Sequence, residues 1–153
     1  MTVCVVESYD YRSRRRTQAQ EAFDVNDRVF VYGSLKAGKG NNNILGSSDL
    51  LASTQTEPTF ALGDVGFPYA FPSAVVPEAY KKLLFPVRGE VYKVDTVESF
   101  MRLDSLEGYP SHYDRQIVRL ENGFDAWMYI QTDWHSASYC NACDLKNGVW
   151  QWD

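Results

Sequence analysis

A glutamate among aromatic residues is the first feature of this sequence that predicts chemistry. Glu107 lies in the stretch LDSLEGYPSHYDR, residues 103–115, close to Tyr109 and Tyr113. It falls in the last turn of a predicted helix, where the negative end of the helix dipole disfavours a carboxylate. Burial by the aromatic side chains would raise its pKa further, toward the range that general acid–base catalysis needs. Taken alone, a glutamate that closes an amphipathic helix is more often a solvated surface residue, so the catalytic interpretation needs further support. For His112 we expect a surface turn, with a part in proton transfer as the alternative.

A glycine-rich loop follows the first apolar strand, in RVFVYGSLKAGKGNNN, residues 28–43. Its G-x-x-x-x-G-K spacing is that of a phosphate-binding loop, but Gly40 stands where the magnesium-binding Ser or Thr is needed. No long helix is predicted after it to hold phosphates. The turn Tyr32, Gly33, Ser34, Leu35 instead predicts converging backbone N–H groups for an anion such as a carboxylate. From the loop alone, a structural turn without a ligand is the favoured interpretation.

The cysteines do not predict a metal site. Cys140-x-x-Cys143 with His135 nearby supplies three zinc ligands, whereas a closed structural site needs four. Cys4 could complete the set in space, but nothing in the sequence indicates that it does. Unpaired thiols are therefore expected, and an odd total of three Cys fits a reducing compartment.

Length and charge restrict the class of protein. A chain of 153 residues is long enough for one domain with its own core. The net charge of -5 argues against nucleic acid as a partner, because binding phosphates needs an excess of Lys and Arg. No apolar run approaches the roughly 18 residues of a membrane span, and the N-terminus lacks the order of a secretory signal. We expect a cytoplasmic protein.

The elements that must position Glu107 and the glycine turn are mostly strands. Apolar and β-branched segments predict strands at 28–33, about 57–63, 87–94, 113–120 and 124–131. Several prolines between residues 58 and 86 exclude a long helix there. The predicted fold class is therefore α+β.

The clearest helix signal covers residues 95–108. Asp95 is the expected N-cap, with Glu98 completing a capping box, and Gly108 is the expected end. Pro110 prevents the helix from resuming. Its expected apolar face consists of Val97, Phe100, Met101, Leu103 and Leu106.

The first 27 residues differ from the rest. They are polar, contain Arg14 to Arg16 and show no regular periodicity, so we expect an exposed N-terminal extension, with contact to an acidic surface or RNA as the alternative. The folded domain is expected over residues 28–153.

Three segments taken together, in this order, resemble a known family. VYGSLKAGKGNNNIL, VRGEVYKV and LDSLEGYPSHYDR are similar to motifs of the gamma-glutamylcyclotransferase-like superfamily, which includes gamma-glutamylamine cyclotransferase and AIG2-like proteins. The resemblance runs from about Arg28 to about Trp150. Asn42 and Asn43 are additions to the single asparagine typical of the family.

The resemblance implies a small curved mixed β-sheet or barrel with few helices. It implies an enzyme that converts a γ-glutamyl amine or γ-glutamyl amino acid to 5-oxoproline and a free amine, with Glu107 as general acid and base. Backbone groups of Tyr32, Gly33, Ser34 and Leu35 would bind the substrate. As a hypothesis, Tyr113 and Tyr129 line the pocket, with core packing as the alternative. No metal or organic cofactor is implied, and the expected partner is a small γ-glutamyl molecule.

A second class of function stays open at this stage. The same scaffold could hold a small ligand without converting it, because fold alone does not determine function. Glu107 favours catalysis, since a pocket that only binds has no need of an acid–base group there.

Overall fold

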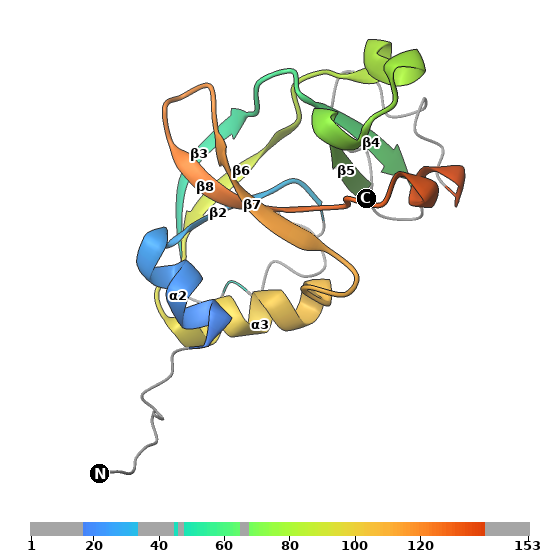
Figure 1. Cartoon of the computed structure of the whole chain (residues 1–153). Helices are drawn as coiled ribbons and strands as arrows, with labels where there is room; N and C mark the ends of the chain where they lie inside the picture. The colour runs from blue at the N-terminus through green and yellow to red at the C-terminus, as the bar shows by residue number, and fades with distance from the viewer. Residues whose placement is uncertain (1–16, 34–44, 46–47, 65–67, 140–153) are drawn as a thin grey trace.

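A five-stranded mixed sheet carries the candidate site in the computed structural model, which describes residues 17–33, 45, 48–64 and 68–139. The strand order is β3-β6-β2-β8-β7, formed by Asp49–Gln55, Arg88–Lys93, Arg28–Val31, Asp125–Ile130 and Asp114–Arg119. Neighbouring strands are antiparallel except β2 and β8, which are parallel. Figure 1 shows helices α2 and α3 below this sheet and the β4–β5 hairpin beside it.

The sheet curves until its edges meet. Thr56, just after β3, forms an antiparallel bridge with Leu120, just after β7. The Glu121 backbone N–H also donates to the Gln55 carbonyl oxygen at 3.0 Å. The expected α+β class and curved mixed sheet are therefore confirmed.

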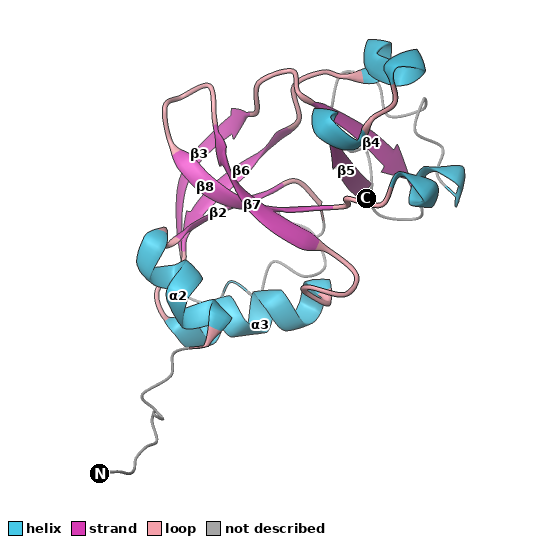
Figure 2. Ribbon diagram, in the orientation of Figure 1, coloured by secondary structure: helices cyan, strands magenta, loops and turns pink. Residues whose placement is uncertain are grey.

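A separate two-stranded sheet and short helices complete the fold. Strands β4 (Phe60–Asp64) and β5 (Pro68–Pro72) pair antiparallel. Between β5 and β6 lie only the short 3₁₀ helices η2 (Ser73–Val75) and η3 (Glu78–Leu83), as the prolines predicted. A third, η4 (Trp134–Tyr139), follows β8. Figure 2 shows these cyan turns grouped around the hairpin.

Helix α3 (Val97–Glu107) begins one residue later than a cap at Asp95 would place it. The N-cap is Thr96, whose hydroxyl accepts a hydrogen bond from the Ser99 backbone N–H at 3.1 Å. The prediction of Asp95 as cap, with Glu98 completing a box, is wrong because the N–H three residues beyond the true cap belongs to Ser99.

The buried face of α3 is narrower than predicted. Phe100 and Leu103 are fully buried, but Met101 and Leu106 are 47% and 40% exposed, so their inclusion in the apolar face is wrong. Gly108 ends the helix as predicted. Its φ of 67° is left-handed, and its N–H bonds to the Asp104 and Ser105 carbonyl oxygens.

Helix α2 (Gln18–Val25) lies within the segment that was expected to be an exposed extension. Ala19 and Ala22 are buried, and the indole N–H of Trp127 donates to the carbonyl oxygens of Ala22 and Asn26 at 3.1 and 3.0 Å. For residues 18–25 the expected exposure is wrong, because two small side chains let the helix backbone approach the sheet. The domain boundary at Arg28 remains a prediction.

The core has two parts, one on each face of the sheet. The first joins the sheet to α2 and α3 and includes Val29, Val31, Phe100 and Leu103. The second uses the alternate strand residues, among them Phe30 and Met128, and packs against β4 and β5. Within the described residues, no helix is long and apolar enough to span a membrane.

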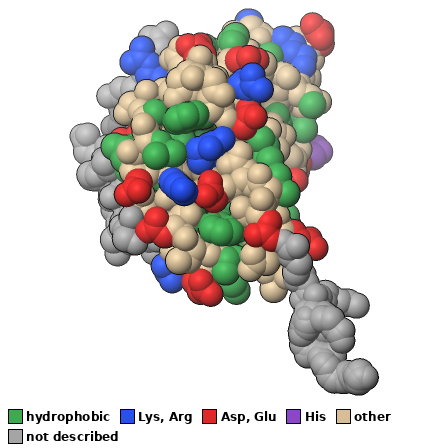
Figure 3. All heavy atoms as spheres, turned by 90° about the vertical axis from the view of Figure 1, so that its left-hand side faces the viewer, with side chains coloured by type: hydrophobic (Ala, Val, Ile, Leu, Met, Phe, Trp, Pro, Cys, Tyr) green, Lys and Arg blue, Asp and Glu red, His purple; other side chains and the backbone are tan. Residues whose placement is uncertain are grey.

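One face of the molecule carries charged side chains of both signs. In Figure 3 Lys and Arg side chains are interspersed with Asp and Glu and with hydrophobic side chains.

Candidate active site

Glu107 is the last residue of α3, and the packing of that helix determines where its carboxyl group lies. The buried Phe100 and Leu103 fix the helix against the sheet, and the turn at Gly108 ends it directly after Glu107. Glu107 is partly buried, and burial raises its pKa from 4.5 to about 7. Among the described residues, no cation and no hydrogen-bond donor contacts its carboxyl group. It is therefore a carboxyl group that exchanges a proton near neutral pH.

Tyr32 approaches Glu107 from the end of β2. Its hydroxyl donates to the backbone carbonyl oxygen of Tyr129 at 2.7 Å. Burial raises the pKa of Tyr32, and the negative charge of Glu107 raises it further, so the two side chains share one electrostatic environment. The end of the first strand and the end of α3 are brought together here.

Gly33 follows Tyr32 where there is little room for a side chain. A Cβ there would lie 3.0 Å from Cγ of Pro68, at the start of β5, closer than an ordinary van der Waals contact. The absence of a side chain lets the turn pass directly beside the hairpin. Ser34 and Leu35, the other two predicted residues of the turn, lie outside the described residues, as do Gly38, Lys39, Cys140 and Cys143.

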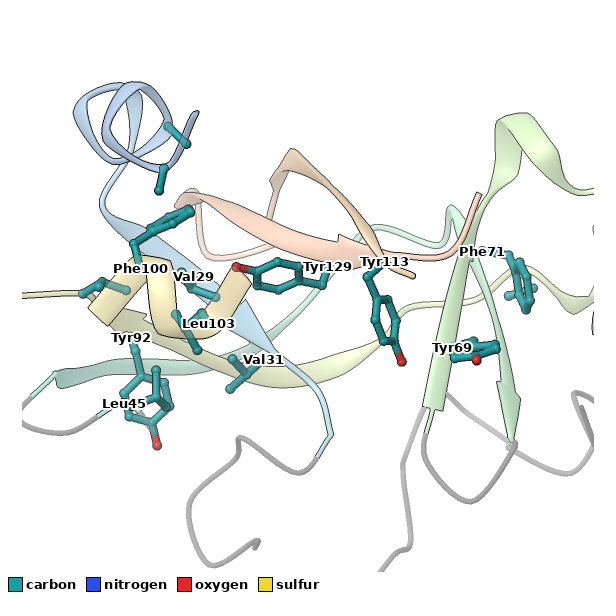
Figure 4. Close-up of a cluster of buried hydrophobic side chains, with 14 of the residues drawn as sticks. Val29, Val31, Leu45, Tyr69, Phe71, Tyr92, Phe100, Leu103, Tyr113 and Tyr129 are labelled. Carbon is teal, nitrogen blue, oxygen red and sulfur yellow. The ribbon is translucent and has the colours of Figure 1, made fainter. Parts of the chain in front are cut away.

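Tyr129 reaches the same place from β8. Its hydroxyl donates to Oδ1 of Asp104 at 2.6 Å, one turn before Glu107 on α3. Burial raises the pKa of Tyr129, and the charges of Asp104 and Glu107 add to the effect. Figure 4 shows the Tyr129 hydroxyl directed at the helix beside Leu103. Tyr129 is buried, and its hydroxyl lies between α3 and the sheet.

Tyr113 occupies a neighbouring position on the hairpin side. Its hydroxyl donates to the Pro68 carbonyl oxygen at 2.9 Å, and its ring meets the Tyr69 ring edge-on, with centroids 5.5 Å apart. In Figure 4 it points toward the base of β5, away from Tyr129. Tyr113 thus supports the region around Gly33, whereas Tyr32 and Tyr129 share the environment of Glu107.

His112 lies on the surface turn between α3 and β7, as predicted. It is exposed, and its Nε2 lies 3.2 Å from the Tyr69 hydroxyl. His135, from the partial zinc pattern, is exposed at η4. In the described part of the chain, no group of three or more His, Cys, Asp or Glu side chains could hold a metal ion.

Two residues of this site, Asp104 and Arg115, were missed from the sequence. Nε and Nη2 of Arg115 bind Oδ1 and Oδ2 of Asp104 at 3.0 and 3.1 Å. Arg115 and Tyr129 are directly opposed in the β7–β8 pair, so both side chains lie on the same face of the sheet. The signal available in the sequence was spacing: Asp104 lies three residues before Glu107, which puts both on one helix face.

Comparison with known proteins assigns the chain to a family. The family model described as gamma-glutamyl cyclotransferase, AIG2-like, matches residues 29–151. The chain belongs to this family. A relative in Vibrio cholerae, provisionally named a gamma-glutamylcyclotransferase, is 39% identical over 107 residues, spanning 70% of this chain and 84% of the relative. The gamma-glutamylcyclotransferase family protein YtfP of Escherichia coli is 32% identical over 103 residues, spanning 67% of this chain and 80% of that protein.

Solved structures of similar proteins show that this chain has the expected fold. The solution structure of Escherichia coli YtfP matches with a TM-score of 0.56 and 28% identity, covering 81% of this chain and 96% of that one. An AIG2-like protein of Mus musculus matches with a TM-score of 0.60, covering 82% and 88%. Its identity of 22% supports a common fold only. The family resemblance drawn from the three motifs is confirmed.

Proposed function

We propose that this protein is a cyclotransferase that converts a γ-glutamyl amine or γ-glutamyl amino acid to 5-oxoproline and a free amine. One observation carries the proposal: a partly buried carboxyl group, Glu107, has a pKa of about 7 beside the turn that ends β2. Membership of the gamma-glutamyl cyclotransferase family supports the choice of reaction.

The reaction needs a base first. The substrate's α-amine is a cation at neutral pH and cannot attack while it is protonated, so ionised Glu107 takes one of its protons. The nitrogen lone pair then attacks the γ-carbonyl carbon of the same molecule, and a five-membered ring forms. Because the nucleophile is tethered to the carbonyl group, holding the folded-back conformer contributes much of the rate.

The leaving amine needs an acid. As the tetrahedral intermediate collapses, the bond between the γ-carbon and the amide nitrogen breaks, and protonated Glu107 supplies a proton to that nitrogen. In total the α-nitrogen loses two protons and the departing nitrogen gains two, so no water is consumed. A group with a pKa near 7 is suited to both transfers.

Binding is assigned to the turn that follows β2. We propose that backbone N–H groups of Tyr32, Gly33, Ser34 and Leu35 hold the α-carboxylate of the substrate, which places its amine toward Glu107. Tyr113 supports the turn through Pro68, and Tyr129 lines the space beside Glu107.

The test is release of 5-oxoproline from a panel of γ-glutamyl amines, γ-glutamyl amino acids and glutathione. Wild type is compared with Glu107→Gln, which keeps the shape of the side chain but removes the base. We expect kcat/KM to fall by roughly a hundredfold or more. Glu98→Gln, an exposed glutamate on the same helix, is the matched control and should keep full activity.

The panel also separates catalysis from simple binding. If wild type binds members of the panel, measured by calorimetry, yet releases no 5-oxoproline from any, the protein is a binding module and the proposal fails. Equal turnover by wild type and Glu107→Gln would leave the reaction in place but remove Glu107 from it.

A further inference from the structure

A charged pair beside Glu107 has no part in the proton transfers described above. The guanidinium of Arg115 binds the Asp104 carboxylate with two hydrogen bonds of 3.0 and 3.1 Å, and the two side chains are only 5% and 13% exposed. Bidentate geometry fixes both partners in orientation as well as in distance. A shielded pair of this kind is costly to desolvate, so its presence beside a site calls for a function.

Aromatic rings hold the Arg115 guanidinium in place. Its Cζ lies 3.8 Å from the centre of the Tyr109 ring, 5.0 Å from Trp127 and 5.2 Å from Phe100. Tyr109 follows directly on Gly108, so the cation packs against the same turn that ends α3. A cation stacked on ring faces is stabilised there and loses rotational freedom.

The hydroxyl protons of Tyr129 and Tyr32, the two tyrosines near Glu107, already form hydrogen bonds to other groups. A tyrosine hydroxyl has one proton to donate and lone pairs to accept with. Tyr129 donates its proton to Asp104 at 2.6 Å, and Tyr32 donates its proton to the Tyr129 carbonyl oxygen at 2.7 Å. Toward Glu107 the Tyr129 hydroxyl therefore offers its oxygen as an acceptor, which suits the N–H groups of a substrate amine.

We propose that Asp104 and Arg115 are positioning residues for the reaction. As a pair they direct the Tyr129 hydroxyl proton away from Glu107, which leaves the phenol oxygen to accept from the substrate's α-amine, and they leave no net charge beside Glu107. This inference rests on the proposed function, because it concerns the binding of the amine and the proton affinity of the same site.

The electrostatic part of the proposal follows from spacing along α3. Side chains three apart on a helix have Cβ atoms about 5–6 Å from each other, so Asp104 and Glu107 are neighbours. Alone, the Asp104 anion would raise the pKa of Glu107, and alone the Arg115 cation would lower it. Bound to each other they cancel, and burial is then the cause of the raised pKa of Glu107.

Other titratable groups face Glu107 from the elements packed around it. Tyr32 comes from the end of β2 and Tyr129 from β8, and the pKa of each is raised, so both stay neutral through the range in which Glu107 titrates. His112 lies on the turn after α3, its Cβ 3.0 Å from the position that a Cβ at Gly108 would take. His112 is unchanged in all the variants below, so it does not affect the comparison between them.

The test uses two substitutions that remove opposite charges. Asp104→Asn keeps an amide oxygen for the Tyr129 hydroxyl but leaves the Arg115 cation uncompensated, so the Glu107 pKa should fall by about one unit. Arg115→Gln leaves the Asp104 anion uncompensated, so the Glu107 pKa should rise by about one unit. The double variant should return to the wild-type value. If the pair had only a structural role, the Glu107 pKa would not shift in opposite directions in the two single variants.

The direct measurement is a carboxyl-carbon NMR titration of protein labelled at glutamate, with Glu107 assigned from the Glu107→Gln spectrum. It needs no substrate, so failure of the proposed function, seen as no 5-oxoproline from the panel, is distinguished from failure of the positioning proposal. If the protein releases 5-oxoproline, the pH at which kcat/KM falls on the acid side should shift in each variant as the Glu107 pKa measured by NMR does. Tyr129→Phe should raise KM for a γ-glutamyl amine several-fold without changing the pH at which kcat/KM falls.

The matched control is the exposed ion pair that joins β7 to β8. Arg119 and Asp125 are 63% and 43% exposed. Asp125→Asn should therefore change neither the Glu107 pKa nor the pH at which kcat/KM falls. Should Arg115→Gln fail to fold, Arg115→Lys keeps the cation and should leave the titration in place, while Asp104→Asn still tests the direction. The proposal would be overturned by an unchanged Glu107 pKa in folded Asp104→Asn. It would also be overturned if the Glu107 pKa shifted in the same direction in Asp104→Asn and Arg115→Gln.

Discussion

The hydroxyl of Tyr32 donates to the backbone carbonyl oxygen of Tyr129 at 2.7 Å, across 97 positions of sequence. This bond joins the end of the first strand to the last strand of the sheet, and both residues lie in the electrostatic field of Glu107. It fixes the start of the glycine turn relative to Glu107, the proposed acid–base residue. The site is thereby held by the body of the fold, where side chains move less than in loops.

Removing the Tyr32 hydroxyl should therefore weaken the fold as well as the site. Tyr32→Phe leaves the Tyr129 carbonyl oxygen buried without that donor, at an expected cost of about 1–3 kcal/mol in the free energy of unfolding. Urea denaturation measures this loss. Tyr80→Phe, at a tyrosine 47% exposed, is the control and should change stability little. Equal effects in the two variants would contradict the importance of the bond.

The pH dependence of catalysis should report Glu107. Because the base must be ionised in the free enzyme, kcat/KM should fall tenfold per pH unit below an apparent pKa of about 7 and level off above it. Steady-state kinetics with one γ-glutamyl substrate between pH 5 and 8 measures the limb. A profile that is flat over this interval would exclude a base with the raised pKa of Glu107.

The same ionisation should make Glu107 a burden on stability at alkaline pH. Its pKa is about 7 in the folded state and ordinarily 4.5, so between these values the folded state binds more protons and stability falls as pH rises. Glu107→Gln lacks the buried charge, so it should be more stable than wild type at pH 8 by at most about 3 kcal/mol.

The Glu107→Gln advantage should shrink as pH falls toward 4.5 and then vanish. Denaturant unfolding at three pH values measures it, and Glu98→Gln, at an exposed position, should show no such dependence. A constant difference at every pH would mean that the substitution acts through packing and not through charge.

Gly89 should tolerate no side chain. A Cβ there would overlap the carbonyl oxygen of Val31 and lie 2.7 Å from Cζ of Phe30, so Gly89→Ala must push β6 away from the end of β2. We expect a loss of about 2–3 kcal/mol in unfolding free energy and, because Val31 precedes Tyr32, a raised KM.

Gly123 provides the comparison for Gly89. Nothing lies within 4 Å of a Cβ there, but its φ is 94°, so Gly123→Ala carries backbone strain of about 1–2 kcal/mol without an effect on KM. Unchanged KM in Gly89→Ala would show that β6 does not support the turn.

Helix α2 should matter for stability. Ala22 is buried against the sheet, so Ala22→Asp puts an unpaired charge in the core and should lower the unfolding free energy by several kcal/mol. Val25→Asp, at a position 69% exposed on the same helix, should change it little. Thermal unfolding distinguishes the two, and equal melting temperatures would mean that α2 is not part of the folded unit.

The sequence predicted the parts of the site that local rules govern. Apolar residues before a Tyr-Gly turn predicted β2, and Gly108 followed by Pro110 predicted the end of a helix that has Glu107 in its last turn. The α+β class followed from strand-like segments around that single helix signal. In each case the determining contacts lie within a few residues of each other.

The missed parts depend on contacts distant in sequence. Strand β3 was missed because it is an edge strand that exposes Leu50 and Leu51 and lacks a regular apolar alternation. Strand β5 carries prolines at both ends because it belongs to a two-stranded sheet. Asp104 and Arg115 both lie within the LDSLEGYPSHYDR motif, but the motif does not show that they pair, and the pairing becomes visible only when β7 is placed against α3. The start of α3 was misplaced because Asp95 and Thr96 are both capable caps.

The position of β2 between β6 and β8 has a consequence for synthesis of the chain. The segment that carries the glycine turn is translated early, but one of its two sheet partners, β8, leaves the ribosome about a hundred residues later. Pairing between strands so far apart is a slow step of folding. A growing chain therefore lacks the Tyr129 hydroxyl and the neutral surroundings of Glu107 until β8 is made, so the proposed activity would be a direct assay of completed folding.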